Sequence, residues 1–262
     1  MPDGEAPRRH GTGQAAGAPA PRDPRIRDPE RTRARILAQA TREFASKGFG
    51  AARMDRIATR CRLSKNTLYY YFGSKERLFV AVLEGVYERL LERQAAVQVR
   101  TLPPEEAVRR IIAQTFAAFR DMPEAIRLLN EENLHRARHL RRSERTRPLY
   151  DRLIGTLAGV LERGAAAGTW RAGMDPVTFY LSFAALAYHY LSNVHTLQIA
   201  LGRDMSSAGA QQAWLAHITE LVLAHARLPA PAAAGADRAG PRGPKAADAV
   251  PAGAVRAGTV RA

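Results

Sequence analysis

The sequence predicts an all-α protein. Between residues 30 and 228, apolar side chains recur at intervals of three and four positions, which is the spacing of one buried helical stripe. No stretch of this region alternates polar and apolar residues convincingly, as a half-buried strand would. Glycine and proline residues divide the region into segments of helical length. We therefore expect about nine helices, three short or medium ones first and longer ones after them.

The first predicted helix spans residues 30–47 and ends before Gly48, because glycine readily adopts the left-handed conformation that closes a helix. Two short helices are predicted next, at residues 54–61 and 64–72. The stripe that buries the first helix consists of Ile36, Leu37, Ala40 and Phe44.

The helices that follow are longer. Ser74 is a suitable N-cap for a pattern that continues to about residue 99. Its apolar positions are Leu78, Phe79, Val82, Leu83, Val86, Tyr87, Leu90 and Leu91. Further helices are predicted at residues 104–120, 123–140, 146–168, 175–201 and 207–227.

The two ends of the chain differ from this helical region in composition. Residues 1–29 and 229–262 are rich in proline, glycine, alanine and arginine without a hydrophobic period, so we expect both to be disordered tails. Cys61 is the single cysteine, so no intramolecular disulfide can form. No signal peptide follows Met1, and no apolar run approaches the roughly 20 residues that span a bilayer. These observations predict a soluble, cytoplasmic protein with no membrane partner.

The charge of the chain is concentrated near its N-terminal end. Net charge is +15, and residues 30–84 contribute +7 of it, from twelve basic and five acidic side chains. A concentrated basic patch is expected of a protein whose partner bears phosphates, either nucleic acid or an anionic membrane surface. The alternative is a general arginine bias, which the alanine, glycine and proline content also suggests.

Two short helices joined near residue 62 match the spacing of a helix-turn-helix. Such helices cross closely, so a small residue is needed where they touch, and Ala58 lies four positions before the turn. Cys61 is expected to be a small core residue beside this contact. The apolar side chains that set the crossing angle are Ile57, Leu63 and Leu68.

The stretch RARILAQATREFASKGFGAARMDRIATRCRLSKNTLYYYFGSKERLFVAVLE resembles the N-terminal DNA-binding domain of the TetR family of transcriptional regulators. Within it, LSKNTLYYYFGSKERLF is similar to that family's recognition helix and the junction after it. The resemblance covers about 55 contiguous residues. It implies an all-helical homodimer, with a three-helix DNA-binding domain at residues 30–76 and a larger dimerisation and ligand-binding domain at residues 77–228.

Three positions depart from the family pattern. Arg62 stands where the family usually has glycine, so a non-glycine residue would adopt a left-handed conformation at a cost of about 1 kcal/mol. Ala52 and Arg53 precede the second helix, where a capping serine or threonine is common. Tyr71 occupies a position often held by histidine; a phenol can still donate a hydrogen bond to a phosphate.

Three consecutive tyrosines lie on the predicted recognition helix, and they cannot all face one core. On a helical wheel Leu68 and Phe72 share the buried edge, and most other positions point outward. Outward residues near the N-terminus of such a helix reach base edges, while flanking hydroxyls and cations contact phosphates. We predict base contacts from Lys65, Asn66 and Thr67, and from Tyr70 beside them. We predict phosphate contacts from Tyr69, Tyr71 and Lys75, with Arg53 also in the DNA-binding set; packing of Tyr69 and Tyr71 against neighbouring helices is the alternative.

The C-terminal helices carry the predicted dimer interface. FYLSFAALAYHYLSNVHTLQIALG is apolar around most of its circumference, so it must be covered on more than one side. With a helix around Trp214, Ile218, Leu221 and Val222, it resembles the four-helix dimer interface of the family. LLNEENLHRARHLRRS and YLSNVHTLQIALGRD also resemble, more loosely, the branch that includes the pyrimidine-utilisation repressors, and no ligand is inferred from that resemblance.

An inducer pocket would be lined by apolar faces of the helices between about residues 80 and 190, with a few polar groups. Candidate polar groups are Asn130, Asn133, His135, Tyr180 and His189; each could instead be a satisfied core or interface residue. Glu131, His135 and His139 share one predicted helix face, but the cationic run HRARHLRRS opposes a divalent cation, so no metal and no cofactor are expected. That run could be a solvated or acid-paired face, or could attract an anionic inducer.

These observations predict a homodimeric repressor that binds an inverted-repeat DNA operator and is released by a small-molecule inducer. An enzyme is disfavoured, because the chain has no glycine-rich phosphate loop, no HExxH and no GxSxG. A helical protein whose basic end binds acidic lipid is the other alternative. Asn66, Thr67, Tyr69 and Tyr70 argue against it, since a lipid-facing helix would show a broad apolar face opposite its cations.

Overall fold

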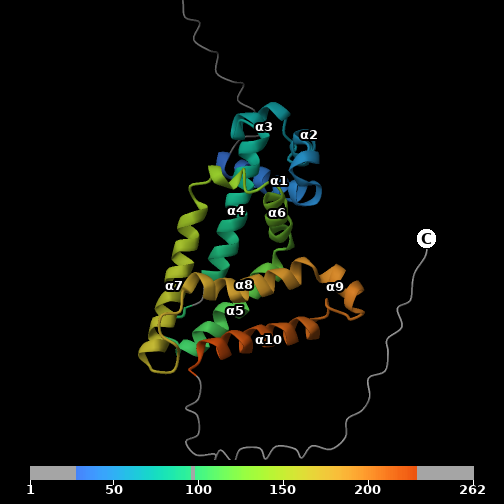
Figure 1. Ribbon diagram of the computed structural model, residues 1–262. Helices are drawn as coiled ribbons and strands as arrows, with labels where there is room; N and C mark the ends of the chain where they lie inside the picture. Colours follow the sequence, from blue (N-terminus) through green and yellow to red (C-terminus); the bar gives the residue numbers. More distant parts are fainter. Residues whose placement is uncertain (1–27, 96–97, 229–262) are drawn as a thin grey trace, which may run out of the picture. The chain divides into compact units, whose positions relative to one another are not determined.

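The computed structural model describes residues 28–95 and 98–228. Within these ranges the regular structure consists of ten α-helices and one short 3-10 helix, with one isolated β-bridge between Trp170 and Arg227 (Figure 1). The predicted all-α class is confirmed. The tails predicted at the two ends lie outside the described residues, apart from residues 28 and 29. No helix among the described residues is long and apolar enough to cross a membrane.

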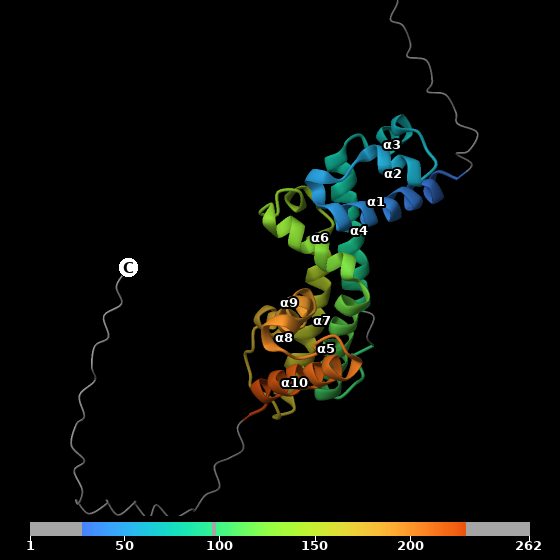
Figure 2. The same ribbon diagram turned by 90° about the vertical axis from the view of Figure 1, so that its right-hand side faces the viewer.

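The first four helices follow the predicted order. They are α1 (Pro29–Ala51), α2 (Met54–Arg60), α3 (Lys65–Phe72) and α4 (Lys75–Ala95). Figure 2 shows α1, α2 and α3 gathered around the beginning of α4, which then continues among the later helices. Ser74 caps α4 as predicted, because its hydroxyl accepts a hydrogen bond from the Arg77 N–H at 3.1 Å.

Helix α1 begins and ends for local reasons. The Asp28 side chain accepts a hydrogen bond from the Arg31 N–H, and Pro29 occupies the first turn, where its missing N–H costs nothing. Gly48 has φ +70°, which breaks the helix where the sequence predicted its end. This conformation favours glycine, and a Cβ at this position would also lie 2.8 Å from a carboxylate oxygen of Glu131 and force that side chain to move.

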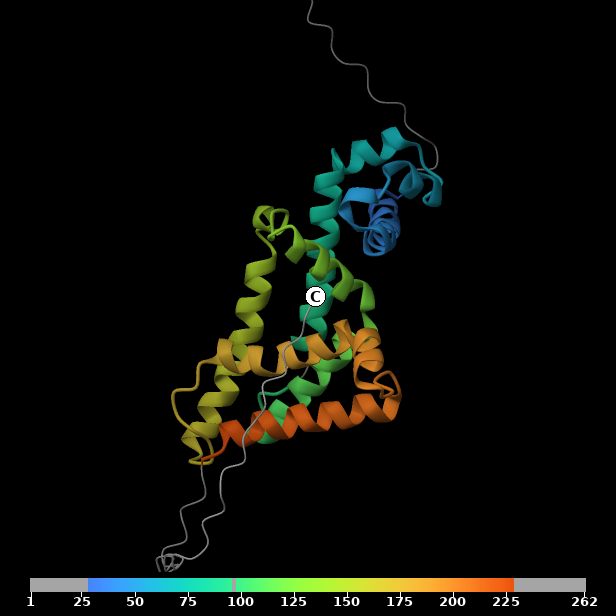
Figure 3. The ribbon, with the colours of Figure 1, turned by 45° about the vertical axis from the view of Figure 1, so that its right-hand side comes forward.

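The remaining helices form the larger part of the molecule. They are α5 (Pro104–Asp121), α6 (Pro123–Leu134), the 3-10 helix η1 (Leu140–Arg142), α7 (Thr146–Ala166), α8 (Pro176–Ser192), α9 (Val194–Leu201) and α10 (Ala208–Ala226). Helix α5 packs against α4, α7, α8 and α10, and α6 packs against α1. Figure 3 shows α8 and α10 running side by side at the end of the molecule away from α3.

The helix predicted at residues 123–140 is wrong in its second half, because α6 ends at Leu134. Arg136 and Ala137 have φ of +55° and +56°, which no α-helix accommodates. The carboxylate of Glu132, 2% exposed, accepts hydrogen bonds from the N–H groups of His139 and Leu140, both at 2.8 Å. A buried side chain therefore satisfies backbone groups that a continuing helix would have paired internally.

The helix predicted at residues 175–201 is divided into α8 and α9 at Asn193. The Asn193 side chain donates a hydrogen bond to the carbonyl oxygen of His189 at 2.9 Å, as does its backbone N–H at 3.1 Å. Asparagine competes in this way with helical pairing, and the chain changes direction at this residue. This break raises the count from the nine predicted helices to the ten observed. The long helix predicted at residues 75–99 is described as α4 to Ala95, and residues 98 and 99 are not helical.

Candidate nucleic-acid interface

The turn between α2 and α3 has the geometry of a helix C-cap. Arg62 has φ +53°, so the left-handed non-glycine residue predicted from the sequence is confirmed. The Leu63 N–H donates to the Ala58 carbonyl at 3.0 Å, and the Arg62 N–H donates to the Thr59 carbonyl at 2.9 Å. This pair of bonds is the Schellman motif. The hydrogen bonds and the burial of the flanking side chains offset the cost of placing arginine there.

The contact between α2 and α3 is apolar. Ile57, Ala58 and Leu68 are buried, and Leu63 packs against them from the turn. Cys61 is 1% exposed, and burial raises the pKa of its thiol, with nearby Arg35 acting in the opposite direction. The thiol is therefore a core group and not a reactive thiolate at neutral pH.

Helix α3 buries one narrow edge. The hydroxyl of Ser64 caps the helix by accepting a hydrogen bond from the Thr67 N–H at 3.1 Å. Only Leu68 and Phe72 among residues 65–72 are buried, as the helical wheel predicted. Gly73, at φ +72°, ends the helix and leads into α4. Lys65, Asn66, Tyr69 and Tyr70 are exposed and available to a partner, and Thr67 and Tyr71 are half-buried.

The three consecutive tyrosines have three different environments. Tyr70 is 75% exposed and Tyr69 is 39% exposed. Tyr71 is half-buried, packs against the core, and meets the ring of Tyr70 edge to face with centroids 5.7 Å apart. The sequence predicted that the three could not share a face, and the structure shows one packed ring and two presented ones.

The residues predicted to read bases are presented unequally. Asn66 is exposed, whereas Thr67 is half-buried and its hydroxyl lies 2.8 Å from that of Ser64. Lys65 is exposed, but its ammonium group pairs with the Asp55 carboxylate of α2 at 3.0 Å. Its hydrogen bond to Asp55 raises the pKa of Lys65. The ion pair with Asp55 therefore competes with a base contact by Lys65.

Two cations, Arg53 and Lys75, were predicted to bind DNA without reading bases, and they flank the helix-turn-helix. Arg53 is exposed at the N-cap of α2 and makes no side-chain cap bond, in agreement with the missing hydroxyl noted in the sequence. Lys75 is half-buried: its Nζ donates to the Gly50 carbonyl at 3.1 Å and lies 4.9 Å from the centroid of the Phe49 ring. Burial lowers the pKa of Lys75, and neighbouring Glu76 partly counteracts this shift.

Sequence reasoning missed a buried carboxylate inside the helix-turn-helix region. Glu43 of α1 is 0% exposed and pairs with Arg60 at 3.2 Å and Arg56 at 3.9 Å, both from α2. The sequence could have indicated that Glu43 is buried, because it lies seven positions after Ile36 on the buried stripe of the first helix. A buried acid at that position is stabilised only by partners, so Glu43 holds α2 against α1.

The five candidate ligand residues do not gather in one place. Asn133 and His189 are exposed, and Tyr180 is buried. Asn130 joins α6 to α8, because it donates to the Ser192 hydroxyl at 3.0 Å and accepts from the Tyr188 hydroxyl. His135 lies at the end of α6, with Nε2 3.2 Å from Glu131.

A buried polar cluster in the larger part of the molecule was not identified from the sequence, except for Tyr180. The Tyr180 hydroxyl donates to Oε1 of Gln94 at 3.2 Å. The ring centroid of Tyr150 lies 6.3 Å from that of Tyr180 and 6.2 Å from that of Tyr87. Burial raises the pKa of all three phenols. Nε2 of Gln94 has no hydrogen-bond partner among the described residues. We name Tyr87, Tyr150, Tyr180 and Gln94 the tyrosine cluster.

A helix-turn-helix followed by a larger helical unit defines a class of DNA-binding regulators, and sequence comparison supports this class. Residues 36–82 match the family model of bacterial regulatory proteins of the tetR family, and residues 104–222 match the tetracyclin repressor-like C-terminal domain. The chain belongs to the TetR family of transcriptional regulators. The relatives it matches are named repressors and regulators, which are DNA-binding proteins and not enzymes.

Two relatives and one solved structure illustrate the similarity. The chain is 36% identical over 199 residues to the HTH-type transcriptional repressor NicS of Pseudomonas putida, covering 76% of this chain and 94% of that protein. It is 30% identical over 177 residues to the HTH-type transcriptional regulator RutR of Escherichia coli K12, covering 65% and 78%. The fold is shared with a TetR transcriptional regulator from Chloroflexus aurantiacus, with a TM-score of 0.59, 21% identity, and coverage of 76% and 98%.

Proposed function

We propose that this protein is a cytoplasmic homodimeric repressor that binds an inverted-repeat operator through residues 30–76 and responds to a small molecule through residues 77–228. The observation that carries the proposal is α3, which buries only Leu68 and Phe72 and exposes the hydrogen-bonding side chains of Lys65, Asn66, Tyr69 and Tyr70. Asn66, Thr67 and Lys65 would read base edges, with Tyr70 beside them. Phosphate contacts would come from Tyr69, Tyr71, Lys75 and Arg53.

The dimer interface is proposed on the exposed face of α8 and α10. Val177, Leu181 and Leu221 are each about half exposed, at 47%, 54% and 51%, although they lie on helices whose other faces are buried. Ile218 and Val222, which the sequence placed with Leu221, are buried within their own subunit. A second copy would cover the exposed apolar face through an isologous contact, and such a dimer presents two recognition helices one DNA turn apart.

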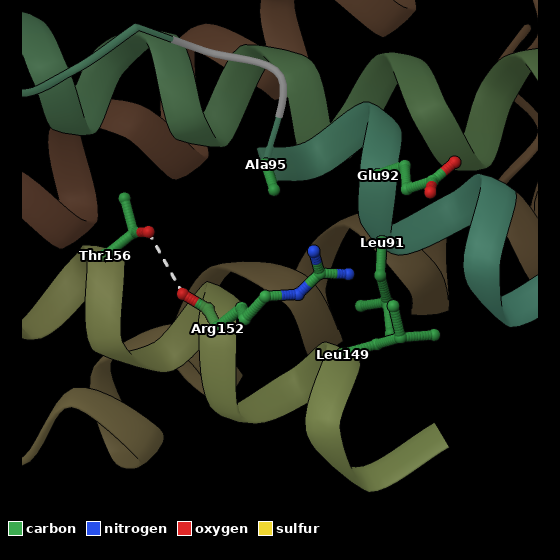
Figure 4. Close-up of a pocket in the computed structure, with 6 residues that line it drawn as sticks. All are labelled: Leu91, Glu92, Ala95, Leu149, Arg152 and Thr156. Carbon is green, nitrogen blue, oxygen red and sulfur yellow. Dashed lines mark hydrogen bonds between the residues drawn. The ribbon is translucent and has the colours of Figure 1, made fainter. Parts of the chain in front are cut away.

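The inducer site is proposed at the tyrosine cluster. Four aromatic or amide groups from α4, α7 and α8 meet there in an otherwise apolar core, and the Gln94 amide retains an unused donor. A pocket of about 260 Å³ opens on the same part of α4 and α7, with Leu91 and Leu149 in its wall. Figure 4 shows Arg152 extending across this pocket toward α4. None of the four cluster residues lines this pocket, but its wall residues Leu91 and Leu149 are close in sequence to Gln94 and Tyr150, so a ligand bound beside Arg152 would lie on the helices that carry the cluster.

Ligand binding would be transmitted to the DNA-binding helices through α4 and α6. Helix α4 carries Tyr87 and Gln94 of the cluster and begins directly after α3. The Glu131 carboxylate of α6 accepts a hydrogen bond from the Phe49 N–H at 2.6 Å, immediately after the break at Gly48. A ligand that prefers one position of these helices would change the spacing of the two recognition helices in the dimer.

A gel-shift on the DNA upstream of the gene for this protein, and on neighbouring divergent promoters, tests DNA binding. We expect a specific shift that weakens as salt concentration rises. The absence of any specific, salt-sensitive shift would contradict the proposal.

Crosslinking tests the transmission step separately. Two DNA-binding units crosslinked at the operator-competent spacing should still bind the inducer but should no longer be released from DNA. Continued release of the crosslinked dimer would exclude a mechanism based on spacing.

A further inference from the structure

The segment between α6 and α7 carries an unusual density of positive charge. Residues 135–147 contain six arginines and one glutamate. Arg145 pairs with Glu88 at 2.8 Å. Among the described residues, no carboxylate lies within 4 Å of the guanidinium groups of Arg136, Arg141 or Arg142, and all three side chains are exposed. We name these three residues the arginine ridge.

The backbone that carries the arginine ridge is held in one conformation. Arg136 and Ala137 both have positive φ, at a cost of about 1 kcal/mol each for non-glycine residues. The buried Glu132 carboxylate compensates: it accepts two backbone N–H bonds and lies 2.7 Å from Nδ1 of His139, which is 3% exposed. The buried acid thus fixes the backbone of the strained segment, and this backbone need not be ordered on binding.

The segment lies against the helix-turn-helix region. Helix η1 contacts α4, and Figure 1 shows the connection between α6 and α7 beside the beginning of α4. Arg138 lies 5.6 Å and Lys75 4.9 Å from the centroid of the same Phe49 ring. The pKa of Glu76 is lowered mainly by hydrogen bonds from its own backbone N–H and the Ser74 hydroxyl, and additionally by the charge of Arg142.

From this placement we infer that the arginine ridge is a second DNA-contacting surface, which binds backbone phosphates beyond those reached by α3. The inference depends on the proposed operator binding. Three exposed guanidinium groups that pair with no carboxylate among the described residues suit a long polyanion, because each group can meet a different phosphate. A small anionic ligand would instead need the groups to converge on one point. Phosphate contacts carry no base information, so the surface adds affinity and salt dependence without changing sequence preference.

The test compares salt dependence in matched variants. The full-length triple variant Arg136→Asn, Arg141→Gln, Arg142→Gln removes three charges, and asparagine retains the left-handed tendency at position 136. The control variant Arg110→Gln, Arg171→Gln, Arg203→Gln makes the same change in net charge on helices and loops that lie away from α3 (Figure 3). Binding is measured by fluorescence anisotropy between 50 and 300 mM KCl, on the duplex that the wild-type protein selects from a random-sequence library.

Each phosphate contact that is lost should reduce the slope of log K against log salt by about 0.9. Because the proposed dimer carries two ridges, we expect the ridge variant to lose between about 1 and 5 units of slope and at least roughly tenfold in affinity at the lowest salt, with unchanged sequence preference. The control variant should keep the wild-type slope. Equal slopes for the ridge and control variants would overturn the inference while leaving operator binding intact. If the wild-type protein selected no duplex, both the proposed function and the inference would fail.

A double variant guards against loss of structure. The double variant Arg141→Gln, Arg142→Gln leaves Arg136 and Ala137, the residues with positive φ, unchanged. A circular dichroism melt checks that this variant is folded. This variant should show an intermediate slope, and a folded double variant with the wild-type slope would also overturn the inference.

Discussion

Two groups of three tyrosines show how the same side chain serves opposite purposes in this molecule. Tyr69, Tyr70 and Tyr71 are consecutive in α3, and two of them are exposed. The other three, in the tyrosine cluster, come from three helices and meet in the interior, where burial raises the pKa of each phenol. Adjacent tyrosines on one helix must diverge, while tyrosines far apart in the sequence can converge.

The comparison assigns different energetic roles to the two groups. The tyrosines of the cluster contribute to the stability of the fold through buried ring area. Those of α3 are expected to contribute to DNA binding through their hydroxyl groups, with Tyr71 intermediate because its ring packs against the core. Mutations that separate stability from DNA affinity therefore test the comparison directly.

The largest effect is expected from truncating a ring of the cluster. Tyr180→Ala should lower the free energy of unfolding by about 3 to 5 kcal/mol, because it leaves a cavity and removes the partner of Gln94. The matched change Tyr70→Ala should alter the free energy of unfolding by less than about 0.5 kcal/mol, since the Tyr70 ring is 75% exposed. Urea unfolding followed by circular dichroism measures both. Similar losses in the two variants would contradict the assignment of roles.

Alkaline pH should destabilise the fold through the cluster. The folded-state pKa of Tyr87 is raised above its ordinary value of 10.0, so its contribution to stability is complete below about pH 10 and is lost as the pH rises further. The loss is about 1.4 kcal/mol per pH unit for each such tyrosine. Tyr87→Phe should make the decline of unfolding free energy between pH 10 and 11.5 shallower. Parallel declines in the variant and the wild-type protein would argue against a buried, protonated phenol.

A smaller effect is expected from removing one hydroxyl of α3. Tyr69→Phe should weaken operator binding by about 1 kcal/mol, roughly fivefold, and equally on all related sequences, since a phosphate contact carries no base information. Asn66→Ala should instead relax discrimination at particular base pairs. Anisotropy titrations on a set of single-base operator variants distinguish the two patterns. Unchanged affinity of Tyr69→Phe at several salt concentrations would remove Tyr69 from the phosphate-contacting set.

The smallest effect concerns the ion pair beside α3. Asp55→Asn should strengthen DNA binding about twofold, because it frees the Lys65 ammonium group and removes a negative charge from the surface. The pair joins two exposed side chains that solvent screens, so stability should change little. Weaker binding would indicate that Asp55 orients Lys65 for the base contact instead of sequestering it.

The helical class and most helix ends could be predicted because they depend on local chemistry. The break at Gly48, the cap at Ser74 and the buried edge of α3 all follow from residues within one or two turns, whereas the left-handed Arg62 was expected from the family resemblance. The end of α6 could not be predicted in this way. Its termination depends on the Glu132 side chain, which binds backbone groups seven and eight residues later.

The candidate site also has features that the sequence predicts and features that only helix packing decides. The recognition helix and its outward residues were identified from one short stretch of sequence, since a single helix fixes their directions. The pairing of Lys65 with Asp55 and the engagement of Lys75 at Gly50 were not, because each joins two helices. The ligand candidates were chosen as polar interruptions of apolar stripes, and the structure disperses them because neighbouring helices decide which interruptions face inward.

The sequence by itself determined that this chain is helical, that its basic N-terminal unit carries a helix-turn-helix, and which edge of α3 is buried. These properties follow from periodicity, capping and the fixed rotation of 100° per helical residue. The tertiary structure decided which polar groups meet: Glu43 with its two arginines, Glu131 with the Phe49 N–H, and Gln94 with Tyr180. Such contacts depend on how helices far apart in the chain pack, and no local pattern of residues specifies that packing.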